Sequence, residues 1–328
     1  MHYAYPGRKS SHPTSFTPRQ SRSSILHTIR RRVRLRTLLT AALALGLLYL
    51  VLSWLFSSSS TEISSIPVAP VFTKAPSGEP NVVIVTVLDD EKGQVYNTAV
   101  KQNRQEYAEK HGYATFMPQA TEYNVGDSPK SWAKVPALRH AMTVFPRTPF
   151  FLFLDDRTLI ANPSLSVEEH LTNKQRIESL AITDIPVVPP DSVIRTTRDQ
   201  PGDLVDLLLV QDREGLSVRS FVLRNGDWAK FFLDAWFDPL YRTYNFQKAE
   251  RHALEHIVQW HGTILAKLAL VPQHMLCAYS EKDKRAATDN GVYENGNFVI
   301  SFAECDSPDR SCRDEMKPWF ERLHGLEI

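Results

Sequence analysis

Two runs rich in β-branched or aromatic residues, each followed by a pair of aspartates, constrain the fold of this 328-residue chain most strongly. The run Asn81–Leu88 reads NVVIVTVL and precedes Asp89-Asp90, and the run Phe150–Leu154 reads FFLFL and precedes Asp155-Asp156. Apolar runs without polar alternation are typical of strands buried on both faces of a parallel sheet. Both acidic pairs would then lie at the carboxyl ends of strands, where open α/β sheets bind their ligands.

Helical patterns separate these runs. We expect one helix over 96–111, which Gly112 ends, and another over 132–145 with Pro136 in its first turn. Ser166 and Glu169 have the spacing of a capping box that begins a further helix. Other strands are expected over 113–117, 207–210, 220–223 and 298–302, and other helices over 227–237 and 246–261. The alternation predicts an α/β fold.

The pair Asp155-Asp156 is the sharpest candidate site. Carboxylates at the end of a buried strand can hold a divalent ion against a nucleotide diphosphate, although a solvated strand end is the alternative. The pair Asp89-Asp90 has the same form, but the following Glu91-Lys92-Gly93 favours an open turn.

Three further polar features are weaker candidates. Asp212 follows a predicted strand and could either cap a turn or contact a substrate. Glu250 shares a helical stripe with apolar residues, so it is either paired or functional, and a salt bridge is the commoner explanation. His252 and His256 have an i, i+4 spacing that can bind zinc, but without a third ligand a solvated helix face is favoured.

The charge of the chain is divided by position. Residues 1–36 hold nine of the 38 Lys and Arg residues and no acid, so the remaining 29 bases face 37 acids and give a net charge of −8. The basic tail directly precedes an apolar run. Membrane orientation therefore explains its arginines better than nucleic-acid binding does.

The run Leu38–Phe56 contains 19 residues without a charge. As a helix it would span roughly 28 Å, close to the thickness of the hydrocarbon core of a bilayer. Tyr49 and Trp54 lie toward its far end, where aromatic side chains favour the interface. The positive-inside rule predicts a type II signal anchor, with a cleaved signal peptide as the alternative.

These features divide the chain into four parts. We expect a cytosolic basic tail over 1–36, a transmembrane anchor over 37–56, a Ser/Pro-rich stem over 57–80 and a lumenal domain over 81–328.

The three cysteines all lie in the predicted lumenal domain, where oxidation is permitted. Cys305 and Cys312 close a short polar loop that contains Pro308, so we predict that they form a disulfide. Cys277 is then expected to be a free, buried thiol.

Eight segments, in order and spacing, resemble a family of fungal and plant Golgi galactosyltransferases and α-1,6-mannosyltransferases, glycosyltransferase family 34. The similarity runs from about residue 81 to residue 323. The segments are 103–113, 132–138, 151–171, 211–216, 220–224, 236–239, 250–256 and 302–305.

The resemblance implies a GT-A-like nucleotide-sugar-binding sheet with helices on both faces. It implies a GDP-mannose or UDP-galactose donor, a glycan acceptor, bound Mn²⁺ and retention at the new glycosidic bond. Asp155 and Asp156 would hold the metal, Asp155 would contact the donor ribose and Lys134 the diphosphate. Asp212 and Glu250 would contact sugar or acceptor hydroxyls. The nearest fungal branch consists of Golgi-membrane α-1,6-mannosyltransferases.

Several residues depart from the family pattern. Arg157 replaces the second Asp of the D-S-D motif, and Ser301 replaces a histidine ligand. Arg219 stands where the family has glycine, Ser217 where it has asparagine, and Arg251 where it has glutamine. Loss of a carboxylate and a histidine together predicts that no functional Mn²⁺ site remains. Arg157 could instead bind a diphosphate through two hydrogen bonds.

Two functions remain open from the sequence. The chain is either an active hexosyltransferase, most simply one that uses GDP-mannose, or an inactive family member that serves as a structural subunit of a Golgi mannosyltransferase complex.

Overall fold

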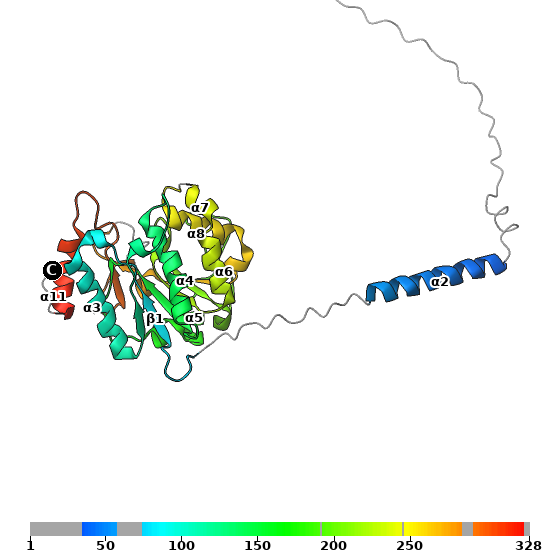
Figure 1. The fold of residues 1–328 in the computed structure, drawn as a ribbon, viewed down its shortest axis with the longest axis horizontal. Coiled ribbons are helices and arrows are strands. Elements are labelled where there is room, and N and C mark those ends of the chain that lie inside the picture. The colour runs from blue at the N-terminus through cyan, green and yellow to red at the C-terminus, as the bar shows by residue number, and fades with distance from the viewer. Residues whose placement is uncertain (1–34, 58–73, 191, 245, 284–290, 325–328) are drawn as a thin grey trace, which may run out of the picture. The chain divides into compact units, whose positions relative to one another are not determined.

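The computed structural model describes residues 35–57, 74–190, 192–244, 246–283 and 291–324. The chain divides into two units, residues 1–68 and 69–328. In the first unit the described residues form the helix α2, Leu35–Ser57 (Figure 1). Side chains of α2 are described at Thr40 and over 42–52. Across the described residues, no helix has both the length and the apolar character that crossing a membrane requires.

The second unit is built on a six-stranded sheet with the order β2-β1-β3-β6-β5-β7. Its strands are β1 Val82–Val85, β2 Ala114–Phe116, β3 Phe150–Leu154, β5 Leu207–Asp212, β6 Gly215–Arg224 and β7 Leu268–Val271. The sheet is mixed, because β6 runs antiparallel to both β3 and β5 while the other pairings are parallel. The two apolar runs, β1 and β3, do pair in parallel, and β6 adds the antiparallel pairings. The two residues Arg213 and Glu214 join β5 to β6, and so short a turn can connect only antiparallel strands.

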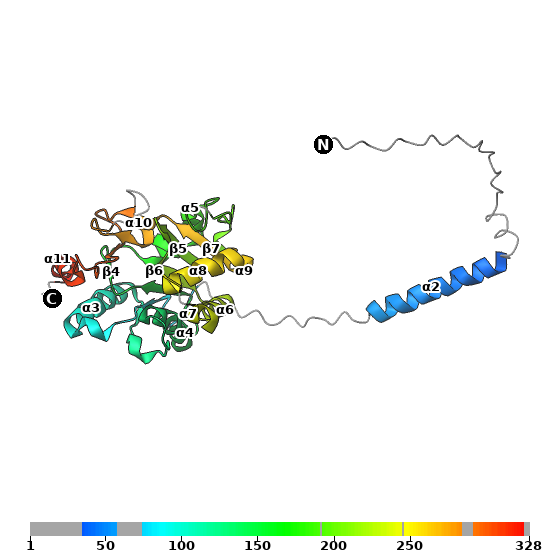
Figure 2. The ribbon, with the colours of Figure 1, turned by 90° about the horizontal axis from the view of Figure 1, so that it is seen from above.

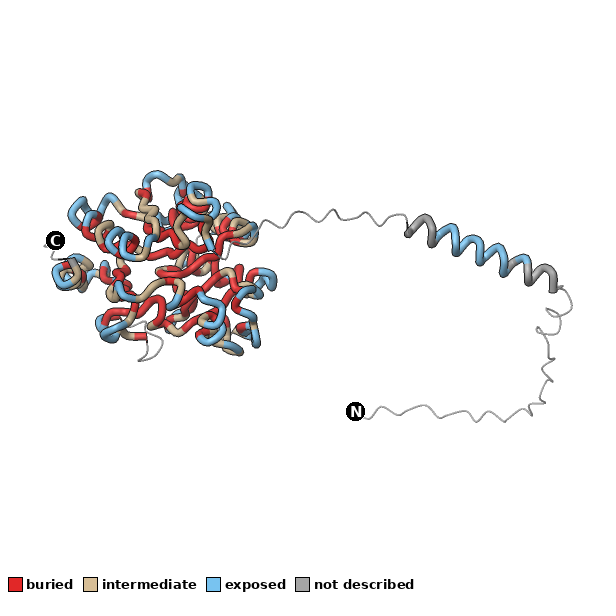
Figure 3. The backbone as a smooth tube through the Cα atoms, turned by 90° about the horizontal axis from the view of Figure 1, so that it is seen from below, coloured by how far each residue is buried: buried red, intermediate tan, exposed pale blue. Residues whose placement is uncertain are grey.

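Helices cover both faces of this sheet. Successive side chains of a strand point to opposite faces, and here both faces are apolar, so each packs against helices in a core of its own. On one face Val83 and Phe151 pack with α4 Lys134–Val144, α6 Asp227–Trp236 and α8 Ala249–Trp260. On the other face Ile84 and Leu152 pack with α3 Gln94–His111, α5 Lys174–Leu180 and α10 Gln273–Leu276. Figure 2 shows α4 and α5 on opposite sides of the strands, and Figure 3 shows the buried residues concentrated between the layers.

A smaller sheet and the last helix form a third core. The strands β4 Thr158–Ile160, β9 Val299–Ser301 and β8 Ala278–Tyr279 pair in that order. Ile300 and Phe302 pack against Met316 and Phe320 of α11, Cys312–His324. The strands β4, β7 and β8 and the helix α11 were not predicted from the sequence.

Short helices complete the unit. They are η1 Asp90–Lys92, η2 Ala120–Glu122, η3 Lys130–Ala133, η4 Glu168–Thr172, η5 Gly202–Leu204, α7 Pro239–Thr243 and α9 Gly262–Leu265. Where an open turn was expected after Leu88, the chain forms η1, and the Asp89 side chain accepts a hydrogen bond from Glu91 N at its start. The Ser166 hydroxyl likewise accepts from Glu169 N, but the element that follows is a π-helical turn.

Candidate active site

A cleft lies where β1 and β3 end. It consists of two adjoining cavities, of about 420 Å³ and about 180 Å³, and both are lined by Ser131, Lys134, Asp155 and Arg157. The larger cavity extends toward α8, and the smaller one toward the end of β1 at Leu88. β1 and β3 are adjacent, and the strand order continues from β1 to β2 on one side of the pair and from β3 to β6 on the other. A reversal of strand order of this kind is the position at which open α/β sheets bind ligands.

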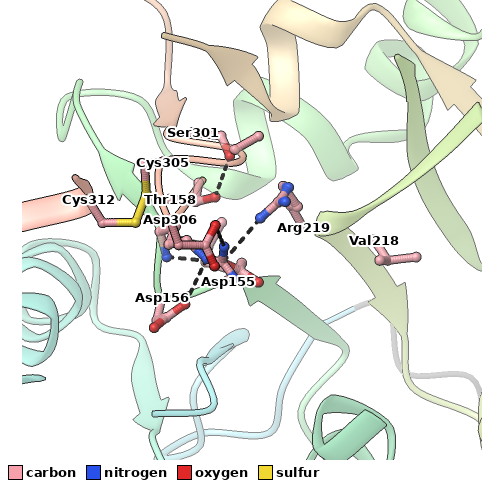
Figure 4. Close-up of polar contacts among 12 residues, drawn as sticks. Asp155, Asp156, Thr158, Val218, Arg219, Ser301, Cys305, Asp306 and Cys312 are labelled. Carbon is pink, nitrogen blue, oxygen red and sulfur yellow. Dashed lines mark hydrogen bonds and ion pairs between the residues drawn. A yellow bond between two sulfur atoms is a disulfide. The ribbon is translucent and has the colours of Figure 1, made fainter. Parts of the chain in front are cut away.

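Asp155 is held between two arginines. Its backbone N–H donates to Arg219 O at 2.7 Å, and its carboxylate Oδ1 accepts from Arg157 N at 3.1 Å. The same oxygen lies 3.5 Å from Arg157 Nε and 3.7 Å from Arg219 Nη1. Figure 4 shows the Arg219 side chain reaching Asp155 from the neighbouring strand. Burial raises the pKa of Asp155, but the charges of Arg157 and Arg219 outweigh it and hold that pKa well below its usual range.

Asp156 has a different partner. Its Oδ2 lies 2.5 Å from Lys92 Nζ, and its backbone carbonyl accepts from Tyr96 OH at 3.0 Å. Burial and the charge of Asp155 raise the pKa of Asp156 to about 6, although Lys92 and Arg157 lower it. The two neighbouring carboxylates are thus each engaged by basic side chains.

Ser301 stands where the family pattern has a histidine as the third metal ligand, and its side chain lies within the small sheet. Ser301 is fully buried, and its hydroxyl accepts a hydrogen bond from Thr158 Oγ1 at 3.1 Å across the β4–β9 pair (Figure 4). Within the described ranges, no three His, Cys, Asp or Glu side chains converge to hold a metal ion. With guanidinium groups on Asp155 and a lysine on Asp156, the residues of this site do not fit a divalent cation.

Lys134 and Glu250 meet across the cleft wall. Lys134 Nζ donates to Glu250 Oε1 at 2.7 Å and to Val218 O at 3.4 Å. Ser131 Oγ donates to Glu250 Oε2 at 2.6 Å. The sequence left Glu250 either paired or functional, and the structure pairs it with a lysine of α4 while both side chains line the larger cavity.

Asp212 lies behind the cleft rather than in it. Its side chain is fully buried and is absent from the lining of both cavities. It forms an ion pair with Arg251 and accepts hydrogen bonds from Tyr279 OH at 2.8 Å and from Glu214 N at 2.8 Å. The structure therefore brings Lys134, Asp155, Arg157 and Glu250 together in the cleft. Asp212 is buried outside the cleft.

The two histidines of α8 do not form a metal pair. His252 Nε2 lies 4.0 Å from Glu255 Oε2, while the His256 ring packs near Tyr241 and Trp260. This arrangement agrees with the helix-face interpretation.

Two residues of the site were missed as functional candidates. Arg219 was noted only as a departure from glycine, and that departure was the signal that could have identified it. Asp306 lies 2.7 Å from Arg157 Nη1 and follows Cys305, which forms a disulfide with Cys312 (Figure 4). No sequence pattern pointed to Asp306. Cys277 is a free and buried thiol.

Known proteins are similar to this chain over most of its length. The chain is 30% identical over 237 residues to an uncharacterized α-1,2-galactosyltransferase of Schizosaccharomyces pombe, covering 69% of this chain and 70% of that protein. It is 27% identical over 302 residues to the probable α-1,6-mannosyltransferase MNN10 of Saccharomyces cerevisiae, covering 82% and 74%. Against an α-1,2-galactosyltransferase of S. pombe, the identity is 29%, and the chain spans 56% of the relative's length while 63% of this chain is covered.

A solved structure is also similar. A glycosyltransferase involved in the glycosylation of the major capsid of PBCV-1 aligns over 74% of this chain and 99% of its own, with 11% identity and a TM-score of 0.49. The sequence profile of the galactosyl transferase GMA12/MNN10 family matches residues 78–312. The chain therefore belongs to the galactosyl transferase GMA12/MNN10 family of glycosyltransferases.

Proposed function

We propose that the protein is a GT-A-like hexosyltransferase that transfers mannose from GDP-mannose, in an α-1,6 linkage, to glycoprotein glycans. The observation that carries this proposal is the cleft at the ends of β1 and β3, where Asp155 is flanked by two arginines in a glycosyltransferase-family chain. A nucleotide sugar presents a diphosphate, which guanidinium groups bind through paired charged hydrogen bonds.

Each cleft residue has a part in this proposal. Asp155 Oδ1 is occupied by the arginines, which leaves the other carboxylate oxygen to accept a ribose hydroxyl. Arg157 contacts the diphosphate. Lys134 also contacts the diphosphate. Glu250, its ion-pair partner, accepts hydrogen bonds from sugar or acceptor hydroxyls. Asp212 lies outside the cleft and holds Arg251 in place through an ion pair, and Arg251 lines the larger cavity.

The membrane arrangement belongs to the same proposal. The helix α2, the arginines that precede it and the uncharged run 38–56 support a single type II anchor in the Golgi membrane. The tail over 1–36 would be cytosolic, and the stem over 57–80 would hold the domain over 81–328 in the lumen.

A second candidate is a catalytically inactive subunit of a mannosyltransferase complex. It is favoured by the ion pairs that already engage the cleft side chains, notably Lys134 with Glu250 and Arg157 with Asp306. A ligand must displace or share these partners, whereas a subunit with a structural role needs no ligand.

A transfer assay separates the two candidates. The full chain, purified in mild detergent, is incubated with an α-mannan oligosaccharide and radiolabelled GDP-mannose or UDP-galactose. We expect mannosylated product from GDP-mannose. Galactosylated product would correct the donor, and no product from either donor would support the subunit function.

A further inference from the structure

We propose that Arg157 and Arg219 together bind the donor diphosphate in the place of a divalent cation, so that the protein binds its nucleotide without metal. This proposal rests on the proposed use of a nucleotide-sugar donor. We call the two guanidinium groups, with Asp155 between them, the arginine clamp.

Both arginines have hydrogen-bonding capacity that the protein does not use. Arg157 Nε is buried and has no hydrogen-bond partner in the part of the chain that the structure describes. No hydrogen bond to a described residue engages the Arg219 guanidinium, which contacts Asp155 only as an ion pair at 3.7 Å. Buried polar groups are almost always hydrogen-bonded, so two guanidinium groups with unused donors on side chains that line a cleft indicate a ligand.

Arg104 provides the contrast within the same region. It is fully buried and donates to Thr86 Oγ1, Asn103 Oδ1 and the backbone carbonyls of Asp155 and Thr158. Its donors are therefore used to hold the chain that follows β3. Arg157 and Arg219 retain 22% and 16% of their side-chain surface and line the larger cavity, so a ligand can reach them.

The backbone fixes the spacing of the clamp. The pairing of β3 with β6 places Leu154 opposite Ser220, so Arg219 lies beside Asp155. Arg157 reaches the same carboxylate oxygen from two residues further along the chain. Asp155 thus orients both guanidinium groups. Asp156 Oδ1 also lies 3.8 Å from Arg157 Nε, and Asp306 pairs with Arg157, so the charges are balanced and a diphosphate would bind by replacing the Asp306 carboxylate.

Asp306 occupies part of the clamp in the structure. Its Oδ1 lies 2.7 Å from Arg157 Nη1, and its side chain is 59% exposed. A diphosphate that binds Arg157 would replace this carboxylate. The clamp therefore predicts that removing the Asp306 charge strengthens nucleotide binding, which a purely structural ion pair would not do.

Isothermal titration calorimetry on the full chain tests the proposal with GDP and UDP as probes. We expect the dissociation constant of the preferred nucleotide to be the same within about twofold in EDTA and in Mn²⁺. Arg157→Lys and Arg219→Lys keep the positive charge but lose the planar guanidinium group, which can donate two parallel hydrogen bonds. Each should weaken binding about tenfold, the effect of one charged hydrogen bond. Asp306→Asn should tighten it several-fold.

Two further variants complete the experiment. Arg157→Asp restores an acidic residue and should weaken binding in both EDTA and Mn²⁺. Arg139→Gln removes a guanidinium that pairs with Asp234 on the surface outside the cleft and should leave binding unchanged. Thermal melting of each variant identifies any that fail to fold, and the wild-type comparison of EDTA with Mn²⁺ tests the metal independence without them.

The outcomes distinguish this proposal from the proposed function. Binding that requires Mn²⁺ would overturn the clamp while leaving the transferase function intact. Absence of binding by either nucleotide in both conditions would overturn both. Metal-free binding that neither lysine variant weakens would overturn the assignment to Arg157 and Arg219.

Discussion

Lys134 Nζ lies 2.7 Å from Glu250 Oε1, and each of the two side chains is only 6% exposed. The pair joins the start of α4 to the start of α8 and forms one wall of the cleft. Breaking a buried ion pair leaves an uncompensated charge, whereas replacing both partners by apolar groups is much less costly.

We therefore expect Lys134→Met to lower the free energy of unfolding by about 3–5 kcal/mol. The double variant Lys134→Met/Glu250→Leu should recover a large part of this loss. Urea denaturation measures both. The exposed pair Arg139–Asp234 is the control, and Arg139→Gln should change stability by less than about 1 kcal/mol. If the double variant lost as much stability as Lys134→Met and Glu250→Leu lose separately and added together, the buried pair would not be coupled as described.

Gly215 begins β6 with a φ of +139°, and an added Cβ would lie 2.0 Å from Glu255 Oε1. That oxygen accepts from Leu216 N and contacts Arg251 Nε, so it cannot move freely. Gly215→Ala should lower the free energy of unfolding by about 2–4 kcal/mol through strain and steric conflict.

Gly296 is a matched control for that substitution. Its φ is +104°, but no described residue has an atom within 4 Å of an added Cβ. Gly296→Ala should therefore cost only the backbone strain, about 1 kcal/mol. Equal effects of the two substitutions in thermal unfolding would show that Glu255 does not constrain Gly215.

The cysteines should react in a fixed order. Burial raises the pKa of the Cys277 thiol to about 12, so almost no thiolate forms at pH 8, and Cys305 is disulfide-bonded to Cys312. We expect iodoacetamide at pH 8 to label no cysteine in the native protein. It should label one after unfolding without reductant and three after unfolding with reductant. Mass spectrometry counts the labels, and a label on Cys305 before reduction would contradict the pairing.

The membrane topology can be tested in sealed Golgi vesicles. A tag at the carboxyl terminus should resist protease until detergent opens the vesicles, because the proposed anchor places the domain in the lumen. A tag before Arg30 should be removed without detergent. The reverse pattern would refute the type II arrangement.

Local sequence patterns predicted the central elements well. The strand Phe150–Leu154 was correct to the residue, because all five side chains are buried and Pro149 and Asp155 bound the run. The helix α11 was missed because its sequence, CRDEMKPWFERLH, is mostly polar and contains Pro318. Its packing depends on Met316 and Phe320 meeting β9, a contact that no local period encodes.

The candidate site was predictable only in part, for the same reason. The end of a buried strand located Asp155, and the apolar stripe of its helix singled out Glu250. The resemblance indicated Lys134, and Arg157 stood out as a departure from the family pattern. The approach of Arg219 to Asp155 depends on the pairing of Leu154 with Ser220, which lie far apart in the sequence. The burial of Asp212 likewise depends on Arg251, which the helix α8 supplies from the other side of the β5–β6 turn.

The central claim is that this cleft transfers a hexose from a nucleotide sugar without a divalent cation. The most direct measurement is the initial rate of transfer from GDP-mannose to a mannan oligosaccharide by the full chain, in EDTA and in Mn²⁺. We expect product in EDTA at a rate that Mn²⁺ changes by less than about twofold. We also expect Arg219→Lys to lower the rate about tenfold at subsaturating donor. Transfer that occurs only with Mn²⁺, or no transfer from any donor in either condition, would contradict the claim.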